Sequence, residues 1–337
     1  MIWTVEQIEE ACERSEPPQF EKYPSEVPEL RLTETFYPLG FPVAIRTNSK
    51  EVLRQCDLKW GMFEKRFRVD PVAAEIVVVE TSDTECPPLP QYRFFDDMLV
   101  MTAGAGNFCV ATFPHGKTRM VVTTAALQHA NYFRQVFLEA AAACQLSTQH
   151  ITGIHAGCVA LNHRGVMLCG DSGAGKTSLT WACARAGWDF LGDDTSYLIH
   201  GEQSRVVMGN RHQVRFRPAA RELFPEVAGA EMTPRIQGHP SIELPTAPMG
   251  HIRTRDCAHV DFIVFLNRRK PGPAELVSYR KDVARCYMRQ WLFGTPEVKC
   301  VHYANIERLL TAPVLELRYE RLDWAVQRLG QMVRDGV

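Results

Sequence analysis

Eight consecutive residues carry the strongest chemical signal in the sequence. Residues 170–177 read Gly-Asp-Ser-Gly-Ala-Gly-Lys-Thr and fit the pattern G-x-x-x-x-G-K-[ST] of a phosphate-binding P-loop. The glycines allow backbone conformations that a Cβ atom forbids, so consecutive amide groups can point at phosphate oxygens. Lys176 supplies a positive charge for the β- and γ-phosphates, and Thr177 supplies a hydroxyl for Mg²⁺. We therefore expect ATP and Mg²⁺ as cofactors, with the nucleotide contacted by Gly170, Asp171, Ser172, Gly173, Ala174, Gly175, Lys176, Thr177 and Ser178.

The segments on both sides of this loop have the pattern that a P-loop requires. The apolar run 166–169 predicts a strand before the loop, and the residues after it predict a helix that ends near Gly187, a typical C′ residue. Residues 154–161 alternate in polarity and then turn at 162–165, which predicts a hairpin leading into the loop strand. Residues 188–191 predict the next strand. The P-loop therefore has a strand, loop and helix context.

Two adjacent carboxylates follow that next strand. Asp193 and Asp194 come directly after Gly192, at the carboxyl end of the predicted strand, where ligands gather in open α/β sheets. One carboxylate can bind the Mg²⁺ held by Thr177 and the phosphates, and the other can accept the proton of an attacking hydroxyl. The pair therefore predicts phosphoryl transfer.

These residues together resemble a known family. His155, the P-loop and the acid pair occur in the order and spacing of the catalytic domain of bacterial HPr kinase/phosphorylase, and the resemblance covers residues 153–198. Residues 191–194 are also similar to the metal-binding segment of ATP-dependent phosphoenolpyruvate carboxykinase. The resemblance implies a mixed sheet and transfer to a hydroxyl, with Asp193, His155 and Lys176 as catalytic residues. It assigns the acid/base role to Asp193, with His155 tuning its charge, and it makes Asp194 and Thr177 metal ligands.

The sequence also departs from that family. The family carries a glutamate followed by an Arg-Gly-x-Gly signature, and this chain has Arg-Ile-Gln-Gly-His-Pro-Ser-Ile-Glu-Leu-Pro at 235–245. Glu243 is a candidate replacement for the glutamate as a further metal ligand, but the signature is absent. The resemblance therefore does not carry over the reverse, phosphorolytic activity or recognition of HPr, and we expect a different acceptor.

Composition limits the classes of partner. With 38 Lys and Arg against 39 Asp and Glu, the net charge of −1 provides no bulk attraction for nucleic acid or an acidic membrane. The 11 cysteines form no CxxC or compact metal-ligand spacing and indicate a reducing compartment. The first residues are acidic rather than signal-like, and no apolar run approaches the length of a membrane span. We expect a cytoplasmic protein, with the oligomeric state left open.

The order of predicted elements divides the chain. Short β-rich runs occupy residues 43–122, a helix at about 49–60 interrupts them, and a long helix at 125–145 closes the first part. We predict an α/β fold in which residues 1–148 form a smaller α+β N-terminal domain of unknown role. Residues 149–337 then form a P-loop domain of the HPr kinase and phosphoenolpyruvate carboxykinase type, with a mixed sheet.

Two functions stay open at this point. The favoured one is an ATP- and Mg²⁺-dependent kinase that phosphorylates a serine-type hydroxyl on a protein, peptide or metabolite. The alternative is a nucleotide-dependent binding or switch module with slow ATP hydrolysis. The adjacent acids favour the kinase, because a nucleotide binder needs no base. Four arginines at predicted strand ends are candidates for stabilising the transferring phosphoryl group: Arg215, Arg217, Arg253 and Arg255.

Overall fold

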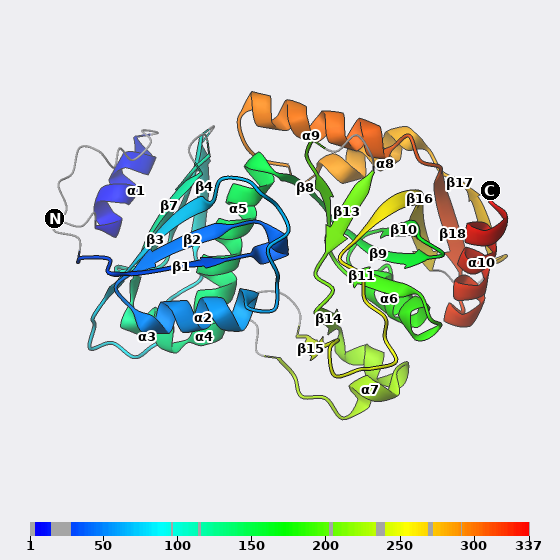
Figure 1. Ribbon diagram of the computed structural model, residues 1–337, viewed down its shortest axis with the longest axis horizontal. Coiled ribbons are helices and arrows are strands. Elements are labelled where there is room, and N and C mark those ends of the chain that lie inside the picture. The colour runs from blue at the N-terminus through cyan, green and yellow to red at the C-terminus, as the bar shows by residue number, and fades with distance from the viewer. Residues whose placement is uncertain are drawn as a thin grey trace. The chain divides into compact units, whose positions relative to one another are not determined.

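The computed structural model describes residues 4–14, 28–95, 97–113, 116–201, 205–233, 240–268, 272–290 and 292–336. The chain divides into two compact units (Figure 1). The first comprises Met1–Gln149 with two short later segments, Arg235–Gly238 and Gly294–Val298. The second comprises His150–Pro234, His239–Phe293 and Lys299–Val337.

The first unit is built on one mixed sheet in the order β1-β2-β3-β7-β6-β5-β4. Its central strands β2, β3 and β7 are parallel, and the flanking strands pair antiparallel. Its strands are β1 (Leu32–Phe36), β2 (Val43–Thr47), β3 (Val72–Val79), β4 (Gln91–Phe95), β5 (Met98–Thr102), β6 (Phe108–Thr112) and β7 (Lys117–Thr123). Its helices are α1 (Val5–Glu13), η2 (Pro38–Gly40), α2 (Lys50–Trp60), α3 (Thr124–Gln128), α4 (Ala130–Tyr132), the π-helix η3 (Phe133–Glu139) and α5 (Ala140–Gln149).

Neighbouring residues of the β3 and β7 strands point to opposite faces of this sheet, as the two-residue period of a strand requires. Val77 and Val121 pack with Ile8 of α1. Ile76 and Met120 instead line a small cavity with side chains of η3 and α5. Both faces of the sheet are therefore covered by helices.

The second unit is organised around β16, a long strand that pairs with three others, β10, β13 and β18. The sheet order is β11-β9-β10-β16-β13-β12-β8, with β18 also on β16 and β17 on β18. Its strands are β8 (Ile151–Ile154), β9 (Ala156–Leu161), β10 (Arg164–Cys169), β11 (Asp189–Gly192), β12 (Ser196–Ile199), β13 (Val206–Gly209), β16 (Cys257–Arg268), β17 (Glu275–Ser278) and β18 (Val314–Tyr319). β14 (Gln213–Phe216) and β15 (Ile242–Pro245) form a separate antiparallel pair. The helices are α6 (Lys176–Arg185), η4 (Pro218–Glu222), α7 (Pro225–Ala228), α8 (Lys281–Arg289), α9 (Pro296–Leu309) and α10 (Leu322–Asp335).

Two layers of helices cover this sheet. Leu179 of α6 and Leu329 of α10 pack on one face with Leu168. Met288 of α8 and Ile306 of α9 pack on the other face with Met167. The strands β10, β16 and β18 run parallel, so their carboxyl ends lie at one edge of the sheet.

The predicted mixed α/β architecture is confirmed, with both parallel and antiparallel pairs in each main sheet. The helix expected over 125–145 extends from Thr124 to Gln149, but a break at His129 and the π-helical segment η3 interrupt its regular turns. No helix was predicted from the sequence over α9, because its apolar residues show little helical periodicity. No helix among the described residues is both long and apolar enough to cross a lipid bilayer.

Candidate active site

The P-loop connects the carboxyl end of β10 to the first turn of α6. Gly170, Gly173 and Gly175 have φ values of 148°, 93° and 100°, which is the region that side chains with a Cβ rarely adopt. Gly175 is the N-cap of α6, and no side chain accepts a hydrogen bond from the amides of the first turn. Those amides are therefore available to an anion.

The tip of the loop is open to solvent, whereas its base is tightly packed. Asp171, Ser172 and Gly173 are exposed. A Cβ on Gly170 would lie 2.8 Å from the Cβ of Ala174, so a larger residue would force the loop apart. The glycine spacing read from the sequence therefore corresponds to a steric requirement at the base.

Lys176 lies beneath the loop and is buried. Its Nζ donates to the backbone oxygens of Gly170 at 2.6 Å and Asp171 at 3.2 Å, and it contacts Nε2 of His155 at 3.0 Å. Burial lowers the pKa of Lys176, and nearby carboxylates, Asp194 first among them, oppose that shift. The ammonium group is thus placed between the loop backbone and the histidine.

His155 bridges the lysine and the second acid of the pair. Its Nδ1 lies 3.4 Å from Oδ1 of Asp194, whose side chain is 51% exposed. Because an ammonium group only donates, the contact with Lys176 assigns the acceptor role to Nε2 and the proton to Nδ1, facing Asp194. Burial lowers the pKa of His155 and the charge of Lys176 adds to that effect, while Asp194 opposes it. The arrangement favours a neutral imidazole between the two charges.

Asp193, the first acid of the pair, is only 7% exposed. Its Oδ2 accepts a hydrogen bond from the Thr177 hydroxyl at 2.9 Å and another from the backbone amide of Arg215 at 3.3 Å. Burial, with a smaller contribution from the charge of Asp194, raises the pKa of Asp193 to about 7. The family resemblance paired Thr177 with Asp194 as metal ligands, whereas the structure brings the Thr177 hydroxyl to Asp193.

Gly157 in β9 leaves room for the backbone of Asp193 next to the strand. A Cβ at Gly157 would lie 2.5 Å from Cγ2 of Thr180 and 2.9 Å from the backbone oxygen of Asp193. The strand next to the P-loop must therefore lack a side chain at this point.

Glu243, expected as a further metal ligand, has other partners. Its carboxylate accepts hydrogen bonds from Arg215 Nε at 2.8 Å and Gln213 Nε2 at 2.6 Å across the β14–β15 pair. Across the described part of the chain, no three His, Cys, Asp or Glu side chains are grouped as a metal site. The structure thus brings Thr177 to Asp193 but leaves Glu243 engaged in an ion pair.

The four candidate arginines separate into two groups. Arg217 lies at the loop, where its Nη2 donates to the Ser172 hydroxyl at 2.6 Å. Arg253 and Arg255 both pair with Asp189, at the amino end of β11 and thus at the end opposite the acid pair. Of these three, only Arg217 is placed to meet a group bound to the P-loop.

Sequence reasoning missed two tyrosines that contact this site. The Tyr287 hydroxyl in α8 accepts from the Gly170 amide at 3.2 Å and lies within donor distance of the Gly170 and His155 backbone oxygens, at 2.8 and 2.5 Å. The Tyr319 hydroxyl would lie 3.0 Å from a Cβ on Gly175. Both residues lie more than 100 positions along the chain from the loop, and no local spacing signals them.

Comparisons with known proteins add a distant structural neighbour. The chain is similar to the solved structure of the HPr(Ser) kinase/phosphatase from Coxiella burnetii, with a TM-score of 0.33 and 10% sequence identity. The aligned region covers 55% of this chain and 93% of that one. No protein-family model and no curated protein sequence matches the chain. The functional conclusions below therefore rest on the geometry of the site.

Proposed function

We propose that this protein is an ATP- and Mg²⁺-dependent phosphotransferase that transfers the γ-phosphoryl group to a hydroxyl of a protein, peptide or metabolite. The observation that carries the proposal is that Lys176 contacts His155, which faces Asp194, while Thr177 donates a hydrogen bond to Asp193. A phosphate cradle alone would serve a nucleotide binder. The adjoining acid pair supplies both a metal-side carboxylate and a base.

The residues of the loop fit a nucleoside triphosphate. The positive φ angles of the loop glycines and the uncapped first turn of α6 supply backbone donors for phosphate oxygens. Lys176 and Arg217 add positive charge at the loop. Such groups stabilise the charge of a phosphoryl group in transfer.

The residues also fit Mg²⁺. This ion is usually bound by one or two carboxylates together with substrate phosphates and water, so a cluster of three acidic ligands is not needed. Thr177 and Asp193 present hydroxyl and carboxylate oxygens to each other at 2.9 Å. When bound, Mg²⁺ neutralises negative charge on the phosphates.

The geometry favours an exchange of the roles that the family resemblance implied for the two acids. Asp193 is enclosed and hydrogen-bonded to Thr177, which suits a residue that organises the metal side of the loop. Asp194 is half exposed and faces His155, so an acceptor hydroxyl can reach it from solvent. In the proposed reaction the acceptor oxygen attacks the γ-phosphorus, the bond to the β-phosphate oxygen breaks, and the acceptor proton passes to Asp194.

The test is transfer from γ-labelled ATP to candidate acceptors. We expect Asp194→Asn to lower the transfer rate about 100-fold or more while nucleotide affinity stays nearly unchanged, because a general base contributes at least that factor. Lys176→Met should weaken both nucleotide binding and transfer. Asp70→Asn and Lys65→Met, at exposed positions of the first unit, are the matched controls.

Three outcomes would contradict the proposal in different ways. Full transfer by Asp194→Asn would remove that residue as the base. Nucleotide binding without acceptor-dependent turnover would favour the switch module. Absence of nucleotide binding by the unmodified protein would refute both functions.

A further inference from the structure

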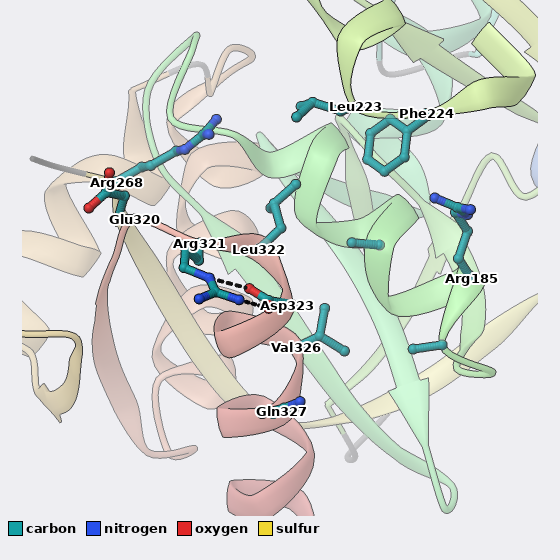
Figure 2. A pocket seen from close by; sticks show the side chains of 12 residues that line it. Arg185, Leu223, Phe224, Arg268, Glu320, Arg321, Leu322, Asp323, Val326 and Gln327 are labelled. Carbon is teal, nitrogen blue, oxygen red and sulfur yellow. Dashed lines mark hydrogen bonds and ion pairs between the residues drawn. The ribbon is translucent and has the colours of Figure 1, made fainter.

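An open groove lies along the flank of α6 in the second unit (Figure 2). It has a volume of about 710 Å³, within the usual range for small-molecule sites. One wall carries Leu223 and Phe224, and the other carries Leu322 and Val326 of α10. Ala182 of α6 also lines the groove. Figure 2 shows Arg268 and Glu320 at one end of the groove and Arg185 at the other.

Both walls of this groove are connected through the chain to residues that contact the P-loop. Arg217, which donates to Ser172, is followed directly by η4, and η4 leads to Leu223. On the other side, Tyr319 reaches Gly175, and the next residue, Glu320, lines the groove. Two chain segments that contact the loop therefore lead directly into the two walls of the groove.

Tyr319 is a second sign that this region meets a polar ligand. Its side chain is 2% exposed, yet its hydroxyl has no hydrogen-bond partner among the described residues. A buried hydroxyl without a partner costs free energy, so such groups usually have a role. This hydroxyl points at the first turn of α6, where the loop meets the groove.

The charge at the groove end next to the loop is also suited to a nucleotide. Arg268 follows Leu266, whose backbone oxygen would lie 3.6 Å from a Cβ on Gly170. Arg268 and Glu320 both line this end of the groove, and Arg268 brings a positive charge to it. The apolar residues lie farther along, and α6 rises only about 9 Å between Lys176 and Ala182. The groove thus presents charged residues near the loop and apolar residues farther away. A nucleotide has the same order, because its phosphates are charged and its base is largely apolar.

We propose that this groove holds the ribose and base of the nucleotide whose phosphates bind to the P-loop. The base lies between the Leu223–Phe224 wall and α10, and Arg268 meets the anionic part next to the ribose. This inference rests on the proposed function, because it assigns the second half of the same ligand.

The experiment separates the groove from the loop by using two ligands. Mg-ATP and Mg-tripolyphosphate are titrated calorimetrically into the unmodified protein, Gln327→Trp and Gln331→Trp. Gln327 is exposed and lines the groove, whereas Gln331 is exposed one turn farther along α10 and does not line it. Ala186→Trp fills the groove from the end of α6 as a second, independent variant.

We expect Gln327→Trp and Ala186→Trp to weaken ATP binding about ten-fold or more, equivalent to 1.4 kcal/mol or more. Tripolyphosphate affinity should stay unchanged in both, and Gln331→Trp should behave like the unmodified protein. Unchanged ATP affinity in both groove variants would refute the assignment of the groove to the ribose and base, and it would leave the P-loop proposal intact. Equal losses for the two ligands would also refute that assignment, because they would indicate damage to the loop. If the unmodified protein binds neither ligand, the proposed function and this inference both fail.

Discussion

A buried histidine network in the second unit predicts a specific loss of stability in acid. His302 in α9 is 1% exposed, and its Nδ1 lies 2.8 Å from the Thr152 hydroxyl. The same hydroxyl contacts Nε2 of His200 at 3.0 Å and accepts from Asn305 at 3.3 Å. Burial, together with the nearby His200 ring, lowers the pKa of His302 to about 4.

The lowered pKa of His302 determines how acid changes the stability of the fold. Because the folded state holds His302 below its unfolded pKa, the unfolded chain binds the extra proton first as the pH falls. The stabilisation by the neutral ring is complete above about pH 6.5, and it is lost as the pH falls from there toward 4. From these two pKa values we expect a loss of about 2 kcal/mol at pH 5 and about 3 kcal/mol at pH 4. A protonated Nδ1 would also direct a proton at an oxygen that already accepts from Asn305.

The assay combines ring titration with unfolding. The NMR signals of the His302 ring, assigned through His302→Gln, should show no protonation down to pH 5 in the folded protein. Denaturant unfolding should show that the unmodified protein loses about 2 kcal/mol more than His302→Gln between pH 8 and pH 5. His251→Gln, at an exposed histidine, is the control and should leave the pH dependence unchanged. A His302 ring that titrates near pH 6.5 in the folded protein would refute this reasoning.

Two further predictions concern the backbone around the loop. Gly157→Ala should destabilise the fold by about 1–3 kcal/mol and reduce phosphoryl transfer, because the added Cβ would overlap Thr180 and press on the backbone of Asp193. Unfolding and transfer assays check this. The control is Gly229→Ala, whose added Cβ would meet nothing within 4 Å. Tyr287→Phe should weaken ATP binding by roughly five-fold, about 1 kcal/mol, because the Gly170 amide loses its acceptor. Calorimetric titration checks this, and unchanged affinity would show that the loop holds its shape without that hydroxyl.

Local sequence signals were sufficient for the elements next to the P-loop. The run 166–169 lies within β10, the helix that follows spans Lys176–Arg185, and the strand predicted at 188–191 is β11, Asp189–Gly192. Each has a signal within a few residues of itself, such as an apolar run or a terminal glycine.

Contacts between distant segments were beyond the reach of the sequence. Tyr287 meets Gly170 because α8 packs on the face of the sheet from which the loop emerges, and no spacing in one sequence encodes that arrangement. The pairing of Glu243 with Arg215 likewise depends on the β14–β15 register. The family resemblance placed His155 beside Asp193, whereas the structure places it against Asp194, and this difference between the two acids required the fold.

The β9–β10 hairpin has a consequence for how this site can change. Its turn contains only Asn162 and His163, both with left-handed φ values of 51° and 64°, and its ladder pairs Ala156 with Cys169. An insertion that slipped this ladder by one residue would reverse the face on which each β9 side chain emerges, and it would displace the neighbouring His155 relative to the loop lysine. Length changes in this turn that shift the register should therefore be incompatible with the site.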